Sequence, residues 1–132
     1  MEYEKYDSTE NIEVGDLVSF VYKHNDLLNQ WENTNKVTKS VYHRIHKNPV
    51  IGVVSAVDGN NITIQKEGII DVNVTGMISI DDKLTSSKIP GKAKAIAYPI
   101  YDEILYREVS IGKVISIYRQ YDKAKVLLDI DN

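Results

Sequence analysis

Three histidines are the residues of this 132-residue chain best suited to metal chemistry. His43 and His46 stand at a spacing that a zinc site on a helix can use. Val41 and Tyr42 precede them and favour extended structure, and no third ligand follows at a recognisable spacing. His24, farther up the same segment, would have to complete a three-histidine site. We therefore expect solvated loop histidines and no metal.

Neighbouring carboxylates at Asp81 and Asp82 could serve as calcium ligands or as a general acid and base. Calcium takes six or more oxygen ligands, and no others are arranged nearby at the spacing of a calcium loop. Asp16 stands in the same way before a strand-like segment. A carboxylate in that place accepts backbone N–H hydrogen bonds and holds a tight turn. We interpret all three aspartates as turn residues.

Nucleophilic catalysis has no signature in the sequence. The serines stand at strand ends without the pattern of a nucleophile elbow, and the glycines are spread singly instead of forming a phosphate-cradling loop. Cysteine is absent, which excludes disulfides and thiolate metal sites and suits a reducing cytoplasm. We predict a protein that is not an enzyme and that has no cofactor.

The elements that must position any site follow a pattern that occurs twice. Similar residues recur in order, as Ile12, Val14, Gly15, Asp16, Val18 and Ser19 and then as Ile78, Ile80, Asp81, Asp82, Leu84 and Thr85. Farther on, Ile51-Gly52-Val53-Val54 with Ser55 returns as Ile111-Gly112-Lys113-Val114 with Ser116. Short alternating strands opened by acidic turns predict an all-β fold, a small β-barrel or β-sandwich built of two similar halves.

Turn residues place the individual strands. Residues 12–22 predict a strand with a turn near its start, and Asp58-Gly59-Asn60 predicts a hairpin between residues 50–57 and a strand that contains Ile62 and Ile64. The other strands are expected at residues 69–74, at 83–96 as two short strands joined by Pro90-Gly91, and at 109–118 paired with 125–130. Sustained helical periodicity is absent from the sequence.

The length favours one domain, since 132 residues are too few for two independent cores. Residues 1–11 are charged and aperiodic, which predicts an extended N-terminal arm that is mobile or ordered by a partner. Residues 12–132 then form a single β-barrel domain with two long loop excursions, 23–48 and 97–108. A short strand is expected within residues 36–42. Unpatterned connections this long are uncommon unless they touch something.

Charge and hydropathy limit the partners. The net charge of −3 and the pI near 5.6 give no long-range field that favours nucleic acid, so none is expected as a partner. The N-terminal residues are acidic and polar where a signal peptide would be basic and then apolar, and no apolar run approaches a membrane span. We expect a soluble protein that is not exported by that route and has no membrane partner.

A basic cluster in the first excursion is one candidate contact surface. Lys39, Arg44 and Lys47 could meet phosphates, carboxylates or an acidic partner, or the cluster could be a solvated loop. If copies pack together, the carboxylates of the N-terminal arm of one copy would lie against this cluster in the next. Those carboxylates are Glu2, Glu4, Asp7 and Glu10.

Aromatic residues are the second candidate surface, because nine tyrosines stand against one tryptophan and one phenylalanine. Tyrosine suits interfaces, since its ring is apolar and its tip is polar. We expect partner contacts from Tyr3 and Tyr6 in the arm, from Trp31 as an anchor, and from Tyr98, Tyr101 and Tyr106 in the second excursion. Carbohydrate stacking and plain partial burial are the competing interpretations.

Residues 72–87, followed by Pro90-Gly91-Lys92-Ala93, resemble a module common in bacteriophage virion proteins. That module has an apolar strand and a glycine, an acidic turn with leucine and two small hydroxyl residues, and a glycine-containing turn ending in alanine. An isoleucine-glycine strand and a closing apolar strand follow, here residues 111–114 and 126–128. Modules of this kind are similar to parts of head-decoration, head-fibre and tail-fibre proteins, and the match spans about Gly15 to Ile130. Asp81 stands where the pattern usually has glycine.

The resemblance implies a β-barrel that trimerises or docks on a repeating lattice, and it brings no catalytic residues. The expected function is a capsid-decorating or auxiliary head protein, made in the cytoplasm of a bacterial host and incorporated in the virion. Its partners would be itself, as a homotrimer, and the major capsid protein or another virion protein. A tail-fibre or baseplate attachment module with a host glycan as partner is one alternative, and a carbohydrate-binding module using Trp31 and the tyrosines is another.

Overall fold

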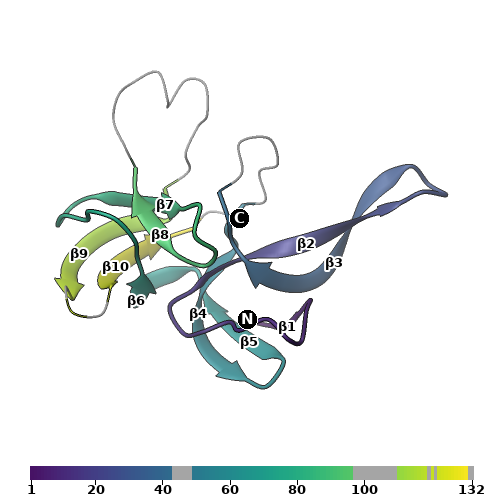
Figure 1. The fold of residues 1–132 in the computed structure, drawn as a ribbon, viewed down its shortest axis with the longest axis horizontal. Coiled ribbons are helices and arrows are strands. Elements are labelled where there is room, and N and C mark those ends of the chain that lie inside the picture. The colour runs from purple at the N-terminus through teal and green to yellow at the C-terminus, as the bar shows by residue number, and fades with distance from the viewer. Residues whose placement is uncertain (43–48, 97–109, 119, 121, 131–132) are drawn as a thin grey trace.

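The computed structural model describes residues 1–42, 49–96, 110–118, 120 and 122–130. The regular secondary structure of these residues consists of β-strands (Figure 1). The described strands are β1 (Glu2–Lys5), β2 (Leu17–Asn25), β3 (Gln30–Lys39), β4 (Gly52–Asp58), β5 (Asn61–Gln65), β6 (Glu67–Asn73), β7 (Lys83–Ser86), β8 (Ala93–Ala95), β9 (Gly112–Tyr118) and β10 (Lys123–Asp129). They form two five-stranded sheets, which confirms the predicted all-β fold of two similar halves.

The first half is a closed barrel with the strand order β1-β3-β2-β4-β5, called the first barrel below. Strand β1 closes it, running parallel to β3 and antiparallel to β5. Tyr3 points inward and packs edge-to-face on Phe20, with ring centroids 5.0 Å apart. The N-terminal segment is therefore extended, as expected, but the expectation of a mobile or partner-ordered arm is wrong for Glu2–Lys5, because these residues pair within the chain.

The second half has the order β6-β10-β9-β7-β8 and is called the second sheet. An isolated parallel bridge between Val74 and Ala93 joins its two outer strands. Counted through this bridge, the order around the second sheet is β6-β8-β7-β9-β10. This is the order of the first barrel, β1-β3-β2-β4-β5, with five added to each strand number. The predicted pairing of the last two strands and the Pro90-Gly91 turn between β7 and β8 are confirmed.

The two halves have equivalent backbone hydrogen bonds as well as the same strand order. Gly15 N donates to Val54 O at 2.8 Å, and Asp81 N donates to Val114 O at 2.9 Å. Each turn is held by an aspartate, since Asp16 Oδ2 accepts from a backbone N three residues earlier at 2.8 Å and Asp82 Oδ2 does the same at 2.8 Å. The turn interpretation of both aspartates is confirmed.

Asp81 has the backbone geometry of Gly15, the glycine at the equivalent position of the first half. Its φ is +73°, and that of Gly15 in the first half is +93°. Aspartate tolerates this left-handed region better than most residues, at some cost in free energy. The turn therefore has the same geometry with aspartate in the second half as with glycine in the first.

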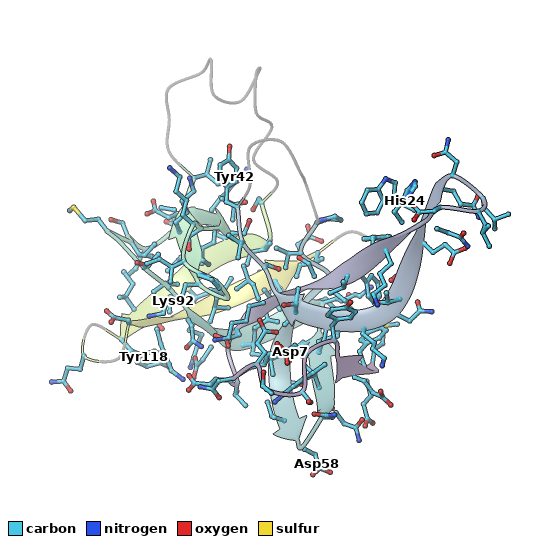
Figure 2. The ribbon with its side chains drawn as sticks, turned by 45° about the vertical axis from the view of Figure 1, so that its right-hand side comes forward. Asp7, His24, Tyr42, Asp58, Lys92 and Tyr118 are labelled. Carbon is cyan, nitrogen blue, oxygen red and sulfur yellow. The ribbon has the colours of Figure 1, made fainter. Side chains whose placement is uncertain are left out.

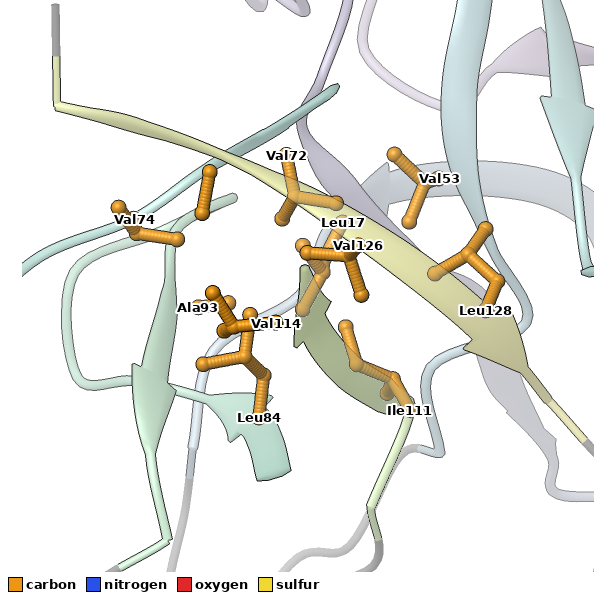
Figure 3. Close-up of a cluster of buried hydrophobic side chains, with 11 residues drawn as sticks. Leu17, Val53, Val72, Val74, Leu84, Ala93, Ile111, Val114, Val126 and Leu128 are labelled. Atoms are coloured by element: carbon orange, nitrogen blue, oxygen red, sulfur yellow. The ribbon is translucent and has the colours of Figure 1, made fainter. Parts of the chain in front are cut away.

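The halves meet at a joint where the outer face of the first barrel covers the second sheet. Leu17 and Val53 lie directly opposite one another on β2 and β4, and both are fully buried in the apolar cluster of the second sheet (Figure 3). A separate cluster, with Val18 and Ile62 among its members, fills the first barrel. The chain thus has two buried clusters where one core was expected, and they depend on each other through this joint.

The first predicted excursion is largely a β-ribbon. Strands β2 and β3 continue past the closed part of the first barrel as a two-stranded hairpin, which Figure 1 shows extending away from the other strands. The expectation of an unpatterned loop is therefore wrong for residues 23–39. The short strand expected at 36–42 overlaps the end of β3, which stops at Lys39. The rest of that excursion at 43–48 and the excursion at 97–108 lie outside the described residues. In the described ranges, no helix has the length and apolarity needed to cross a bilayer.

Candidate functional site

The outer part of the β2–β3 hairpin, residues 21–35, is called the ribbon below. The candidate site is the tip of this ribbon. Its strands remain paired to the end, where Asn25 lies opposite Gln30. The Asn25 side chain fixes the turn, because its Oδ1 accepts from Leu27 N at 3.1 Å and from Leu28 N at 3.2 Å. Its Nδ2 donates to Glu32 Oε1 at 3.0 Å across the strands. These bonds give the tip a defined shape.

Large apolar side chains project from this tip into solvent. Leu27 is 96% exposed, Leu28 62% and Trp31 69%. Figure 2 shows His24 on the outer part of the β2–β3 hairpin, away from the other strands, and neither buried cluster includes Leu27, Leu28 or Trp31. Burying side chains of this size lowers the free energy of the system. A group of exposed apolar side chains on a fixed turn is typical of a contact surface.

Trp31 is supported from one side by His24. The two rings pack edge-to-face with centroids 5.3 Å apart, and His24 Nδ1 lies 2.6 Å from Asp26 Oδ1. His24 is thus held by a carboxylate and an aromatic ring in its own hairpin. Within the described ranges, no group of three or more histidine, cysteine or acidic side chains could hold a metal ion, while His43 and His46 lie outside these ranges.

The other described residues of the predicted contact set lie apart from the ribbon tip. Tyr3 contributes to the core of the first barrel. Tyr6 is 41% exposed, and Lys23 Nζ lies 5.2 Å from the centre of its ring. Lys39 is at the joint, partly buried, with its Nζ 3.9 Å from Asp16 Oδ2. The structure therefore places Trp31 at the tip and gives Tyr3 and Lys39 roles inside the chain.

Three of the N-terminal carboxylates, Glu4, Asp7 and Glu10, have partners in their own chain. Glu4 lies 3.8 Å from Lys36, and both carboxylate oxygens of Glu10 accept from the Thr38 hydroxyl at 2.9 Å. Hydrogen bonds from the Thr9 hydroxyl and backbone N hold the pKa of Asp7 below its usual value. The hypothesis that these groups meet the basic cluster of another copy stays a prediction. Its other members, Arg44 and Lys47, and the tyrosines Tyr98, Tyr101 and Tyr106 lie outside the described residues.

Sequence reasoning missed Leu27 and Leu28, although the sequence contains a usable signal. Both leucines stand between Asn25-Asp26 and Asn29, which are turn residues. Leucines inside a polar turn have no strand face that could bury them. Such a placement predicts exposed apolar side chains at a hairpin tip.

Comparison of the chain with protein-family models, with curated proteins and with solved structures finds no match. Function must therefore be inferred from geometry and from the sequence motif. The motif at residues 72–93 spans the end of β6, the aspartate turn, β7 and the turn into β8. It is thus a structural unit of the second sheet.

Proposed function

We propose that the chain is a structural protein of a bacteriophage virion that decorates the capsid and docks on the shell through the tip of its ribbon. The observation that carries the docking role is the exposure of Leu27, Leu28 and Trp31 on a turn fixed by hydrogen bonds. The module-like sequence of residues 72–93 supports the virion assignment. In this role the protein acts by binding to the capsid shell and catalyses no reaction.

The physical basis is burial of the ribbon tip against the shell. Fully burying a leucine side chain contributes about 1.5–3 kcal/mol, so three large apolar groups at one tip can dominate an interface. A tip fixed before binding loses little conformational entropy when it docks. Because the protein binds the assembled shell, it raises the stability of that state by mass action.

Capsid binding tests the proposal with a matched pair of variants. Leu27→Asp places a charge at the ribbon tip, and Met77→Asp places one in the connection between β6 and β7, at a side chain that is also 96% exposed. Purified protein is mixed with shells that lack it, and bound protein is measured by co-sedimentation. We expect native protein and Met77→Asp to bind and to raise the melting temperature of the shell, and Leu27→Asp to bind at least about tenfold more weakly.

Two outcomes would contradict this proposal. Equal shell binding by both variants would exclude the ribbon tip as the docking element. Binding to purified tails and not to shells would exclude capsid decoration and favour the tail-fibre or baseplate module instead.

A carbohydrate-binding module is the second candidate, and the surroundings of Trp31 favour it. The exposed indole lies beside the His24–Asp26 pair, so a flat apolar surface and polar groups occur together at the tip. Aromatic faces of this kind stack on sugar rings. Glycan-array binding by isolated monomer that disappears in Trp31→Ala and persists in Met77→Asp would support this function. An array without signal for the native protein would exclude it among the glycans tested.

A further inference from the structure

The ribbon is a two-stranded sheet, and among the described residues no third strand lies along either of its outer edges. Strand β2 pairs with β4 only at Leu17 and Val18, and β3 pairs with β1 only at Lys36 and Val37. Beyond these positions the two strands pair only with each other. A two-stranded hairpin is marginally stable in water by itself, and a third strand adds much of the stability of a sheet. The ribbon is therefore a sheet that one more strand would complete.

The outer edge of β3 is closed at the base of the ribbon by side chains of the same strand. Asn35 N donates to Asn33 Oδ1 at 2.9 Å, and Lys36 N donates to Thr34 Oγ1 at 3.3 Å. Asn35 has a φ of +57°, and the register between β2 and β3 shifts at the same place. A bulge of this kind bends a strand and interrupts pairing along its edge. A further strand is therefore unlike to the pattern of β3 and must use β2.

Backbone hydrogen bonds near the start of β2 show how its peptide groups are oriented. Ser40 N, just after β3, donates to Leu17 O at 2.8 Å. Ile51 N, just before β4, donates to Val18 O at 2.9 Å. Leu17 thus directs its backbone groups to β3, and Val18 directs its groups to the β4 side. Because this direction alternates along a strand, the even-numbered residues of β2 face the β4 side.

The same alternation continues into the ribbon, where the β4 side of β2 is an open edge. Val21, an odd-numbered residue, faces β3 as expected, since its O accepts from the Thr34 hydroxyl at 2.7 Å. Tyr22 and His24 therefore direct their N–H and C=O groups to the open edge. In the ranges that the structure describes, no strand pairs with them on that side. A row of unpaired backbone groups is a template for a strand from another chain.

The ribbon also has one face that carries its aromatic side chains. Directly opposite residues lie on the same face of a sheet, and Trp31 lies opposite His24. Tyr22, two residues before His24 on the same strand, lies on this face too and is 39% exposed. The other face is polar, with Lys23 opposite Glu32. A strand added to β2 would thus bury alternate side chains against Tyr22 and His24.

We propose that the ribbon binds an extended segment of the shell protein, which adds to the outer edge of β2 as a third strand. The segment has apolar side chains on the face of Tyr22 and His24 and polar side chains on the face of Lys23. Its backbone hydrogen bonds supply affinity, and its alternate side chains supply specificity. This inference rests on the proposed docking role and adds the mode of binding, in which the tip leucines anchor the ribbon beside the added strand.

Charge disfavours a second copy of this chain as the occupant of the edge. Two β2 edges that pair antiparallel about Tyr22 and His24 would set the two Lys23 side chains directly opposite one another. Like charges in that position are destabilising. A segment with a polar, uncharged or acidic residue opposite Lys23 avoids this repulsion.

Proline substitution tests the edge, because proline removes an N–H group and is tolerated on an edge strand. His24→Pro removes a donor from the open edge of β2, His24→Ala removes only the side chain, and Asn33→Pro removes a donor from the outer edge of β3. Binding to shells that lack the protein is measured by co-sedimentation. We expect His24→Pro to bind about tenfold more weakly than His24→Ala, because a carbonyl of the added strand loses its hydrogen bond. Asn33→Pro should bind like the native protein.

Hydrogen exchange followed by mass spectrometry gives a second measurement, on the native chain. When the protein is bound to shells, the amides of residues 20–25 should exchange at least about tenfold more slowly than in the free protein, since the edge amides become paired. The amides of residues 30–35 should change less, because the outer edge of β3 stays unpaired. Circular dichroism and thermal melting verify that every variant is folded.

The outcomes separate this inference from the docking proposal. Equal binding by His24→Pro and His24→Ala, or unchanged exchange of residues 20–25 on shells, would overturn strand addition, while a loss of binding in Leu27→Asp would still support docking by the tip alone. Slow exchange of residues 20–25 that depends on protein concentration without shells would show that a second copy takes the edge. A native protein that does not bind shells would overturn both proposals.

Discussion

The first barrel and the second sheet have the same strand order and matching turns, and they differ in what their outer faces contact. At the paired positions on β2 and β4, Leu17 and Val53 are buried by the other half. At the equivalent positions on β7 and β9, Lys83 and Lys113 face solvent. The backbone hydrogen bonds are nearly identical in the two places. Side chains on the outer face therefore decide whether a repeated unit is covered or exposed.

The β2–β3 and β7–β8 hairpins differ in the same way. In the second sheet, β7 and β8 are joined by a short turn that packs against the first barrel through Gly91. In the first barrel, the equivalent hairpin is lengthened into the ribbon, with leucines and a tryptophan exposed at its tip. One hairpin thus joins the halves, and the other exposes its tip to solvent.

Leu17→Ala should produce the largest loss of stability. Leu17 is fully buried at the joint, and its truncation leaves a cavity between the halves. We expect a loss of about 3 kcal/mol in the free energy of unfolding, measured by chemical denaturation. Lys83→Ala is the control at the equivalent position and should change stability by less than about 0.5 kcal/mol. Equal effects at the two positions would show that the joint does not distinguish the halves.

Gly112→Ala and Gly52→Ala compare equivalent positions on β9 and β4. A methyl group on Gly112 would overlap the backbone oxygen of Leu127, whereas one on Gly52 would overlap the Ile64 side chain, with Cδ1 at 2.7 Å and Cβ at 2.9 Å. The end of the Ile64 side chain can rotate away and its Cβ must shift slightly, whereas the paired backbone at Leu127 is held by the strand ladder. We expect losses of about 3 kcal/mol at Gly112 and about 1 kcal/mol at Gly52, measured by thermal and chemical unfolding. The reverse order would contradict this account of the packing.

Asn73→Ala removes the amide that joins β6 to the aspartate turn of the first barrel. The buried Asp16 Oδ1 loses its hydrogen bond from Asn73 Nδ2, so we expect a loss of about 2 kcal/mol. Glu4→Ala, at the equivalent exposed position, should change stability by less than about 0.5 kcal/mol. Urea unfolding of the two variants measures the difference. A larger effect for Glu4 would require a structural role that its exposed carboxylate does not have.

Asp81→Gly should have the smallest effect and the opposite sign. The φ of +73° suits glycine better than aspartate, and this gain is partly offset by the greater freedom of glycine in the unfolded chain. We expect a gain of about 0.5 kcal/mol, measured as a small rise in melting temperature. Gly15→Asp at the equivalent turn should instead be destabilising, because a Cβ there lies 3.0 Å from Asn73 Oδ1.

Local sequence patterns predicted much of the fold. The Asp58-Gly59-Asn60 turn, the Pro90-Gly91 turn and the aspartate turns lie where expected, because their residues act on neighbouring backbone groups. Strand β1 was missed, because its place depends on pairing with β3 and β5 far along the chain. The ribbon was missed because both of its faces are solvated, so its residues do not alternate.

The candidate site was predicted only in part. Trp31 was recognised as an anchor from its residue type, and the structure places it exposed at the ribbon tip. Tyr3 was assigned to contacts because its segment has no periodicity, yet the barrel uses its ring as core. Residue type alone cannot tell these two uses of an aromatic side chain apart.

The sequence by itself determined the strands, the turns and the repetition of one unit, since these depend on residues close together in the chain. The tertiary structure alone decided that β2 is buried on both sides at its start, where Leu17, Val18 and Ser19 are all inaccessible. An alternating pattern distinguishes the two faces of a strand, but it does not specify what covers each face. That choice depends on contacts between the two halves, which are distant in sequence and meet only when both have folded.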